Sequence, residues 1–382
     1  MKILLLSGYD ADSHRYWWKG LLRHLTEHHW TVLTLPPRYF SWRIRGNSLS
    51  WAFGERERLE ADYDLVIATS MVDLSSLRGF VPSLGNIPTL VYFHENQFEF
   101  PASAQQQDSL SPQIVNLYSA LCADQLCFNS EFNRSSFFKG AAALLKKLPD
   151  AVPTGLIERL QRRSKVLPVP LFEPDLAAEE AARRPENEPG DIWPDNVALA
   201  DRPLRVLWAA RWEYDKGPEL LNRILAALEK QGVNYQLCLL GQRFRNSPEV
   251  FDLIQDTYSH RLVQSGFVPS KETYLDWLAA ADVVLSTAIH EFQGLAVLEA
   301  IDAGCIPVLP NRLVYPEWVP ESYLYANLPT EPALEAEAAA ALLCDVAEGG
   351  WVAPDISGVK WSALEAPWRA CLRESAGKNE EH

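Results

Sequence analysis

The stretch Leu204-Arg-Val-Leu-Trp-Ala-Ala-Arg211-Trp-Glu-Tyr-Asp-Lys216-Gly217 joins an apolar run to a charged loop. The apolar run predicts a buried strand, and residues 219–230 continue with the apolar spacing of a helix. Apolar runs that predict further strands alternate along the chain with helical patterns. This alternation is typical of βαβ units around a parallel sheet. The predicted strands are 235–240, 262–266, 283–287 and 306–309, and the predicted helices are 248–258, 271–281 and 295–303.

The first half of the chain repeats this texture, with strands predicted at 2–7, 31–35, 65–68, 90–93 and 126–129 and a helix at 16–28. Between the halves, residues 169–203 are rich in proline and acidic residues, which is typical of an exposed linker. Two successive α/β domains predict a cleft between them, with ligands at the carboxyl ends of the strands. The predicted organisation is an N-terminal Rossmann-like domain at 1–169, a linker or mobile insertion at 170–203, a C-terminal Rossmann-like domain at 204–350, and a helical segment with a tail at 351–382.

Composition sets limits on the class of protein. The chain has 382 residues, of which 47% are hydrophobic, so two globular domains with proper cores are expected. No apolar run reaches membrane-spanning length, and the apolar start ends at Ser7, which favours a buried strand over an export signal. The six cysteines form no C-x-x-C pair and suit reduced thiols in the cytoplasm. The net charge of −15 disfavours nucleic-acid binding over the whole surface.

Two motifs predict a site for a diphosphate and a sugar. Arg211 and Lys216 follow a strand, and a guanidinium and an ammonium at that position can converge on a diphosphate. That spacing alone is also common among solvated surface charges. The second motif is His290-Glu-Phe-Gln-Gly-Leu-Ala-Val-Leu-Glu299, in which a glycine and the amides of a helix N-terminus can approach an anion. Its two glutamates, Glu291 and Glu299, can accept hydrogen bonds from neutral sugar and ribose hydroxyls. The alternative is a capped surface helix with two solvated acids, which agrees less well with the apolar residues around Glu299.

Taken in order along the chain, these motifs resemble the retaining glycosyltransferases of family 4, which adopt the GT-B fold of two Rossmann-like domains facing a cleft. The resemblance includes Gly241-Gln242, Gly266-Phe-Val-Pro269, Ala281-Asp-Val-Val284 and Glu291-x7-Glu299. It implies a nucleotide-sugar site in the C-terminal domain, with the Arg211 and Lys216 cations on the diphosphate. The residues expected to bind the donor are Arg211, Lys216, Gly241, Glu291, Phe292, Gln293, Gly294, Leu295 and Glu299.

A closer resemblance covers Met1 to about Tyr325. The segments Tyr92-Phe-His-Glu-Asn-Gln97 and Phe128-Asn-Ser-Glu-Phe-Asn133 are similar to those of the tRNA-queuosine alpha-mannosyltransferase family. This implies transfer of mannose from GDP-mannose to queuosine, at the wobble position of the tRNA-Asp anticodon. One departure is the first loop, Gly8-Tyr-Asp-Ala-Asp-Ser-His14, where the family pattern has paired glycines.

His94 follows a predicted strand, which would bring it to the edge of the sheet that faces ligands. We expect it to contact the transferred sugar or the acceptor hydroxyl, although a histidine hydrogen-bonded within its loop is the commoner arrangement. Three arginines at 38, 43 and 45 alternate with aromatic residues, a pattern that permits stacking on an anticodon loop. The predicted catalytic residues are Arg211, Lys216, Glu291 and His94. The predicted acceptor-binding residues are His14, Arg43, His94, Glu95, Asn96, Gln97, Asn129 and Ser130.

The sequence has no recognised D-x-D motif and no paired carboxylates, so we expect no obligatory metal and no dedicated protein base. Two other functions stay open at this point. A family-4 enzyme acting on a lipid or a polysaccharide would use the basic residues 159–165 at a membrane surface. An inactive module would bind sugar nucleotides or RNA without turnover, which the intact donor motifs disfavour.

Overall fold

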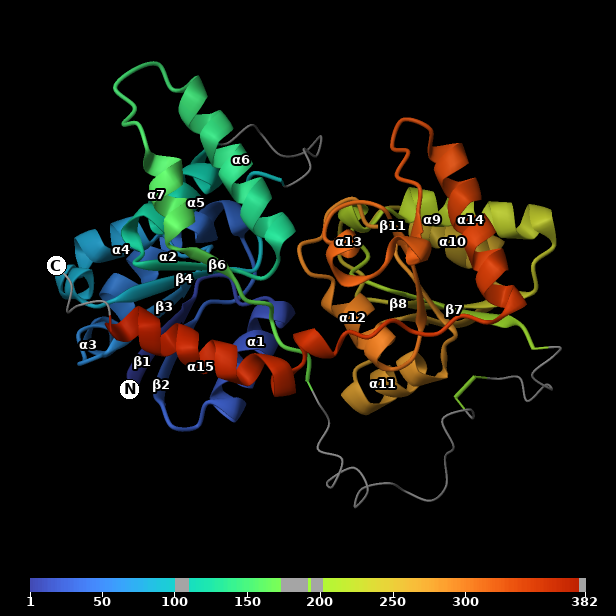
Figure 1. The fold of residues 1–382 in the computed structure, drawn as a ribbon, viewed down its shortest axis with the longest axis horizontal. Helices are drawn as coiled ribbons and strands as arrows, with labels where there is room; N and C mark the ends of the chain where they lie inside the picture. Colours follow the sequence, from blue (N-terminus) through green and yellow to red (C-terminus); the bar gives the residue numbers. More distant parts are fainter. Residues whose placement is uncertain (100–109, 173–191, 194–201, 378–382) are drawn as a thin grey trace. The chain divides into compact units, whose positions relative to one another are not determined.

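A computed structural model describes residues 1–99, 110–172, 192–193 and 202–377 (Figure 1). The chain forms two compact units, the first made of Met1–Phe172 with Ser357–His382 and the second of Glu173–Ile356. Most of the predicted linker lies outside the described residues. One part of it, Trp193, is buried in the second unit and packs edge-on against Trp277, with the Arg205 guanidinium over its ring.

The first unit is built on a six-stranded parallel sheet with the strand order β2-β1-β3-β4-β5-β6. Residues of the central strands are buried on both faces, as expected for a parallel sheet covered by helices. The strands are β1 (Lys2–Ser7), β2 (His29–Thr34), β3 (Leu65–Thr69), β4 (Thr89–Phe93), β5 (Gln125–Phe128) and β6 (Ser164–Val166).

Successive residues of β4 show how its two faces are covered. Phe93 stacks on Phe128 and packs against Phe137 of α6, within the larger core of the unit. Tyr92 points to the other face, where Trp17 of α1 stacks on it and Trp368 of α15 lies beside it. The helices are α1 (Asp12–His24), α2 (Phe40–Gly54), α3 (Arg56–Leu59), α4 (Leu74–Phe80), α5 (Ser111–Cys122), α6 (Glu131–Lys147), α7 (Leu156–Arg162) and α15 (Trp361–Gly377).

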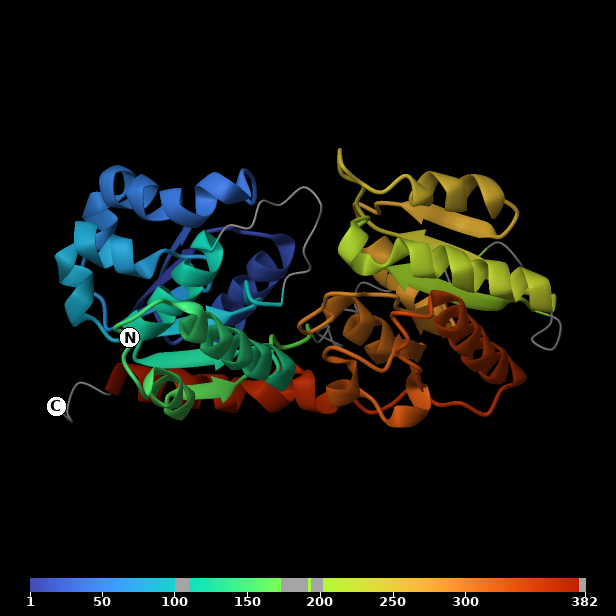
Figure 2. The ribbon, with the colours of Figure 1, turned by 90° about the horizontal axis from the view of Figure 1, so that it is seen from above.

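The C-terminal helix α15 is therefore part of the first unit, although the whole second unit separates it from the rest in sequence. Figure 2 shows it running along the first unit on the side away from α2. The Arg369 guanidinium bonds to the His24 carbonyl oxygen, and Lys165 pairs with Glu374. The sequence predicts a partly helical segment here. The apolar stripe of Trp361, Leu364, Trp368 and Leu372 explains why it docks on a sheet.

The second unit has a six-stranded parallel sheet in the order β12-β11-β10-β7-β8-β9. Helices α9, α10 and α14 share one apolar cluster with residues of β7, β8, β10 and β11. The strands are β7 (Leu204–Ala209), β8 (Tyr235–Leu240), β9 (Leu262–Gly266), β10 (Val283–Leu285), β11 (Ile306–Pro310) and β12 (Leu324–Tyr325). The helices are α9 (Pro218–Gln231), α10 (Val250–Thr257), α11 (Lys271–Ala280), α12 (Leu295–Asp302), α13 (Tyr315–Trp318) and α14 (Pro332–Glu348).

Candidate active site

In the second unit, the loops after β7 and β10 meet at the carboxyl edge of the sheet. The loop after β7 turns through a short 3-10 helix, Tyr214–Lys216, and then Gly217 opens α9 in a left-handed conformation. A Cβ on Gly217 would come within 2.0 Å of the Thr287 carbonyl oxygen, so only glycine allows this approach. Thr287 fixes the contact further, because its Oγ1 donates to the Lys216 carbonyl oxygen at 2.7 Å. The predicted donor motifs are therefore neighbours in space.

Lys216 is buried among acceptors from both loops. Its Nζ donates to the His290 carbonyl oxygen at 3.0 Å and to Glu291 Oε2 at 3.1 Å, and Asp215 Oδ2 lies 3.3 Å away. Burial lowers the pKa of Lys216, but the Glu291 and Asp215 carboxylates outweigh it and raise that pKa above its usual value. Burial acts to raise the pKa of Glu291, and the Lys216 ammonium reverses the effect and lowers it. The cluster is therefore ionised at neutral pH.

Sequence reasoning missed Asp215, although it directly precedes Lys216. Its side chain is almost fully buried, and its carbonyl oxygen accepts hydrogen bonds from the Ile289 and His290 amides. Burial would raise the pKa of Asp215, but the Lys216 charge and a hydrogen bond from His290 hold it well below its usual range. The available signal was an acidic residue directly before Lys216, the lysine predicted to bind the diphosphate.

Arg211 lies differently from Lys216. Its side chain is 56% exposed and pairs with Glu213 at 2.6 Å. Beside it, Trp212 stacks on Phe251, and the Trp212 amide donates to the Gln242 carbonyl oxygen at 3.0 Å. Gly241 is required where these loops cross, because a Cβ there would lie 1.8 Å from the Ala210 carbonyl oxygen.

The predicted donor residues of the second motif lie around the start of α12. Gly294 caps the helix in a left-handed conformation, and the Phe292 amide donates to Glu291 Oε1 at 3.0 Å. Glu299 lies inside α12 and accepts from Lys271 Nζ at 2.6 Å and from the Tyr274 hydroxyl at 3.0 Å. Phe292 and Gln293 are buried, whereas Leu295 is half-buried.

The first unit gathers the predicted acceptor residues at the carboxyl edge of its own sheet. The rings of His14 and His94 stack with centroids 4.1 Å apart, and Trp17 packs edge-on against His94. His14 Nε2 lies 3.2 Å from Glu95 Oε2. His94 Nε2 is buried without a hydrogen-bond partner among the described residues. Burial, and then the neighbouring His14, hold the pKa of His94 well below its usual value, so its imidazole is neutral at neutral pH.

Buried asparagines fix the loop that carries His94. Asn129 Nδ2 donates to the His94 carbonyl oxygen at 2.8 Å, and Asn133 Nδ2 donates to Asn129 Oδ1 at 2.8 Å. Asn96 Nδ2 bonds to Asn133 Oδ1 at 2.9 Å, and Ser130 Oγ caps α6 by accepting from the Asn133 amide. Asn96 and Ser130 were expected to bind the acceptor, but both are fully buried and their polar atoms serve this network. Acceptor binding by Asn96 and Ser130 stays a prediction.

The remaining predicted acceptor residues are spread along the same edge. The Gln97 amide donates to Asn116 Oδ1 at 2.9 Å, and Arg43 is buried on α2. In the unusual first loop, Asp10 turns inward, where Trp18 Nε1 donates to it at 3.0 Å and Arg15 pairs with it at 3.3 Å. That loop therefore presents less negative charge than its sequence suggests.

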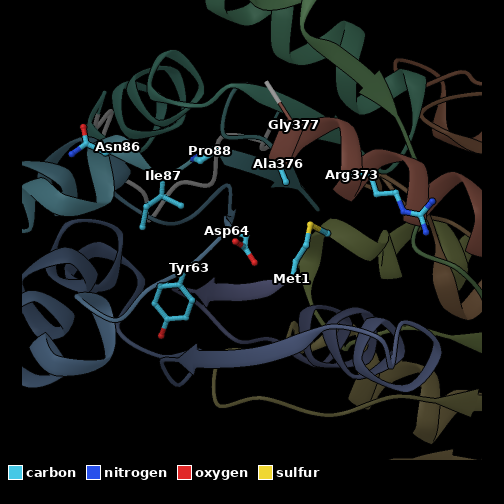
Figure 3. Close-up of a pocket in the computed structure, with 9 residues that line it drawn as sticks. All are labelled: Met1, Tyr63, Asp64, Asn86, Ile87, Pro88, Arg373, Ala376 and Gly377. Carbon is cyan, nitrogen blue, oxygen red and sulfur yellow. The ribbon is translucent and has the colours of Figure 1, made fainter. Parts of the chain in front are cut away.

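A separate cavity of about 580 Å³ opens at the opposite edge of the first sheet (Figure 3). Met1, Asp64 and Pro88, which precede strands, line it together with Arg373 of α15. None of the predicted site residues lines it. Along the described parts of the chain, no helix combines the length and apolar character needed to cross a membrane.

Two solved structures share the fold of this chain at low sequence identity. Sucrose-phosphate synthase from Thermosynechococcus elongatus superposes with a TM-score of 0.65 at 15% identity, covering 98% of both chains. The Anabaena protein HepE, solved in complex with UDP, gives a TM-score of 0.58 at 14% identity, covering 98% of this chain and 100% of that one. Residues 191–347 match the family described as glycosyl transferases group 1. Fold and site thus define a GT-B glycosyltransferase.

Two further matches narrow the class. Residues 2–171 match the N-terminal domain of tRNA-queuosine alpha-mannosyltransferases. The tRNA-queuosine alpha-mannosyltransferase of Drosophila melanogaster is 32% identical over 324 residues, which are 85% of this chain and 83% of that protein. The chain belongs to the tRNA-queuosine alpha-mannosyltransferase family, which agrees with the resemblance found in its sequence motifs.

Proposed function

We propose that this chain is a retaining mannosyltransferase that moves mannose from GDP-mannose to queuosine at the wobble position of tRNA-Asp. The observation that carries the proposal is the family match over residues 2–171, the unit that holds the His14–His94 pair. The second unit supplies the charged groups that a nucleotide-sugar donor requires.

Binding of the sugar nucleotide would require Lys216 and Arg211 to exchange carboxylate partners for the diphosphate. With Asp215 and Glu291 both beside it, the Lys216 charge is already neutralised. A diphosphate that approaches Lys216 would compete with Glu291, leaving that carboxylate to accept hydrogen bonds from sugar hydroxyls. Arg211, whose side chain is half exposed, can turn from Glu213 to the same diphosphate. Glu299, held by Lys271 and Tyr274, would accept hydrogen bonds from the ribose hydroxyls.

In the transfer itself, the bond between the anomeric carbon and the diphosphate oxygen breaks, and the carbon bonds to a queuosine hydroxyl oxygen. The hydroxyl proton passes to the departing phosphate on the same face, so configuration is retained. Negative charge grows on the leaving diphosphate, and Arg211 and Lys216 stabilise it. The neutral His94 offers its free Nε2 to the sugar or to the attacking hydroxyl. We expect turnover without an added divalent cation.

A screen of donors and acceptors tests this. Purified enzyme is incubated with GDP-mannose, UDP-glucose or UDP-galactose and with tRNA-Asp that contains or lacks queuosine, and the digested nucleosides are analysed by mass spectrometry. We expect one hexose on queuosine only, and only from GDP-mannose. Transfer from another sugar nucleotide would show that the donor is not GDP-mannose. A parallel reaction contains a lipid fraction, and hexose on the lipid with unmodified queuosine would exclude tRNA as the acceptor. Lys216→Ala is the inactive control.

A further inference from the structure

The first turn of α2 carries aromatic side chains that face solvent. Tyr39 is 72% exposed and Trp42 is 52% exposed, and two large exposed rings within one helical turn indicate a contact surface. Tyr39 also holds a left-handed backbone with φ of 54°, a conformation that is costly for a bulky residue. The Arg38 guanidinium lies over its ring, 5.6 Å from the centroid. Strain of this kind is often found at functional sites.

Trp42 lies over a glycine of its own helix. A Cβ added to Gly46 would come within 2.4 Å of the indole ring, so the absence of a side chain there lets the ring cover the helix surface. The ring is supported on one side by the backbone and reaches solvent on the other. It therefore forms a fixed flat surface, as aromatic stacking on a base requires.

The next residue, Arg43, is a buried cation. It is 9% exposed, and its Nε has no hydrogen-bond partner among the described residues. The nearby carboxylate of Asp73 pairs with Arg45 instead, at 3.3 Å. Arginine is rarely buried without a partner, because desolvating a charge is costly. The site is therefore suited to an anion that comes from outside the chain.

This surface lies beside the predicted acceptor site. Asn47 follows Arg43 by one helical turn, so both side chains lie on the same face of α2. Asn47 Nδ2 donates to the Met71 carbonyl oxygen at 2.9 Å, just after the end of β3. Gln97 Nε2 lies 3.6 Å from the Met71 sulfur. The start of α2 is thus two contacts away from the loop that carries His94.

We propose that Tyr39, Trp42 and Arg43 form a platform for the single-stranded anticodon loop, with the two rings stacking on unpaired bases and Arg43 binding a backbone phosphate. Single-stranded RNA is recognised by this combination of stacking and phosphate contacts. A buried cation whose Nε has no partner among the described residues, in a helix turn that also carries two exposed rings, favours a polyanion with flat bases over an apolar protein partner. The inference rests on the proposed function and adds which surface holds the tRNA.

The test measures affinity for fluorescently labelled, queuosine-containing tRNA-Asp. Trp42→Ala and Tyr39→Asn are the main variants, since both side chains are exposed and asparagine tolerates a left-handed backbone. Each is expected to weaken binding by about 5- to 150-fold, the usual effect of losing one base stack. Phe53→Ala is the matched control, because Phe53 is 72% exposed on the same helix, about 16 Å further along it. It should bind tRNA like the wild type.

The second measurement is the salt dependence of tRNA binding by Arg43→Gln, after its melting temperature has been shown to equal that of the wild type. Losing one phosphate contact should lower the slope of log affinity against log salt by about 0.7. Wild-type tRNA affinity in both Trp42→Ala and Tyr39→Asn, with modification continuing, overturns the platform and leaves the proposed function intact. The platform is also overturned if these variants bind tRNA normally but lose affinity for anionic phospholipid vesicles. If the wild-type enzyme neither binds nor modifies tRNA, the proposed function fails first.

Discussion

Lys216 Nζ lies 3.1 Å from Glu291 Oε2, across 75 residues of sequence, and Asp215 Oδ2 lies 3.3 Å from the same ammonium. Two carboxylates on one cation leave the cluster with a net negative charge. We expect a diphosphate that approaches Lys216 to displace one of them. In the proposed function, the ion pair is the resting state that the donor opens, and we propose that Glu291 is the carboxylate that it releases.

Lys216→Ala is expected to lower the rate of mannosylation by about 10²–10³-fold, since it removes a charged donor from the leaving group. It also leaves Asp215 and Glu291 buried without their shared cation, which weakens donor binding further. Initial rates at varied GDP-mannose concentration measure both effects. Lys230→Ala, in the exposed last turn of α9, is the control and should keep wild-type rates. A Lys216→Ala enzyme with wild-type kcat would contradict this role.

Gly217→Ala tests the close approach of the two donor loops. Gly217 and Gly232 both have left-handed backbones, with φ of 67° and 69°, but only at Gly217 would a Cβ meet backbone, at 2.0 Å. Gly232→Ala should cost about 1–2 kcal/mol of unfolding free energy and leave turnover unchanged. Gly217→Ala should cost more and abolish donor binding, because the Lys216 loop must move. Denaturation curves measure the loss of stability, and donor titrations measure the loss of binding. Equal effects of both substitutions would show that the close approach of Gly217 to Thr287 is unimportant.

The alternation of strands and helices could be predicted from the sequence, because apolar runs in parallel sheets are nearly continuous. The donor motifs could also be found, since Arg211 and Lys216 directly follow a strand. A single sequence does not show which side chains pair when they lie far apart along the chain. Nothing in the local pattern indicates that Glu299 is held by Lys271 and Tyr274, which come from another helix.

Burial explains the other differences. Asn96 and Ser130 have the polar side chains of ligand contacts, yet the packing of α6 against β4 encloses them, so their hydrogen bonds serve the loop. The local sequence pattern also does not indicate that Trp368 packs against Tyr92, because the whole second unit lies between these residues in sequence. Such contacts depend on tertiary packing, which overrides local pattern.

Glu299→Gln is expected to raise the KM for GDP-mannose by about tenfold, while kcat stays within about twofold. The glutamine loses the negative charge that Lys271 pairs with at 2.6 Å, and its amide can accept fewer hydrogen bonds from a ribose. Glu272→Gln, on the exposed side of α11, should match the wild type. An unchanged KM combined with a lower melting temperature would assign Glu299 a structural role only.

His94→Gln tests the buried neutral histidine through the pH dependence of stability. The pKa of His94 is lowered by folding, so below about pH 6.5 the unfolded chain binds a proton that the folded chain does not. The free energy of unfolding should therefore decrease as the pH is lowered through this range, and this group contributes at most about 1.4 kcal/mol per pH unit. Denaturation curves at several pH values should show a shallower fall for His94→Gln.

His28, whose pKa burial also lowers, contributes equally to both proteins and cancels in the comparison. His260→Gln, at a side chain that is 57% exposed, controls for the substitution itself and should keep wild-type stability at pH 7.5. If His94→Gln retained the full wild-type slope, folding would not lower the pKa of His94, and the folded ring would be protonated below about pH 6.5. A protonated ring could not accept a hydrogen bond at Nε2, and its proposed contact with a hydroxyl would then have to be as a donor.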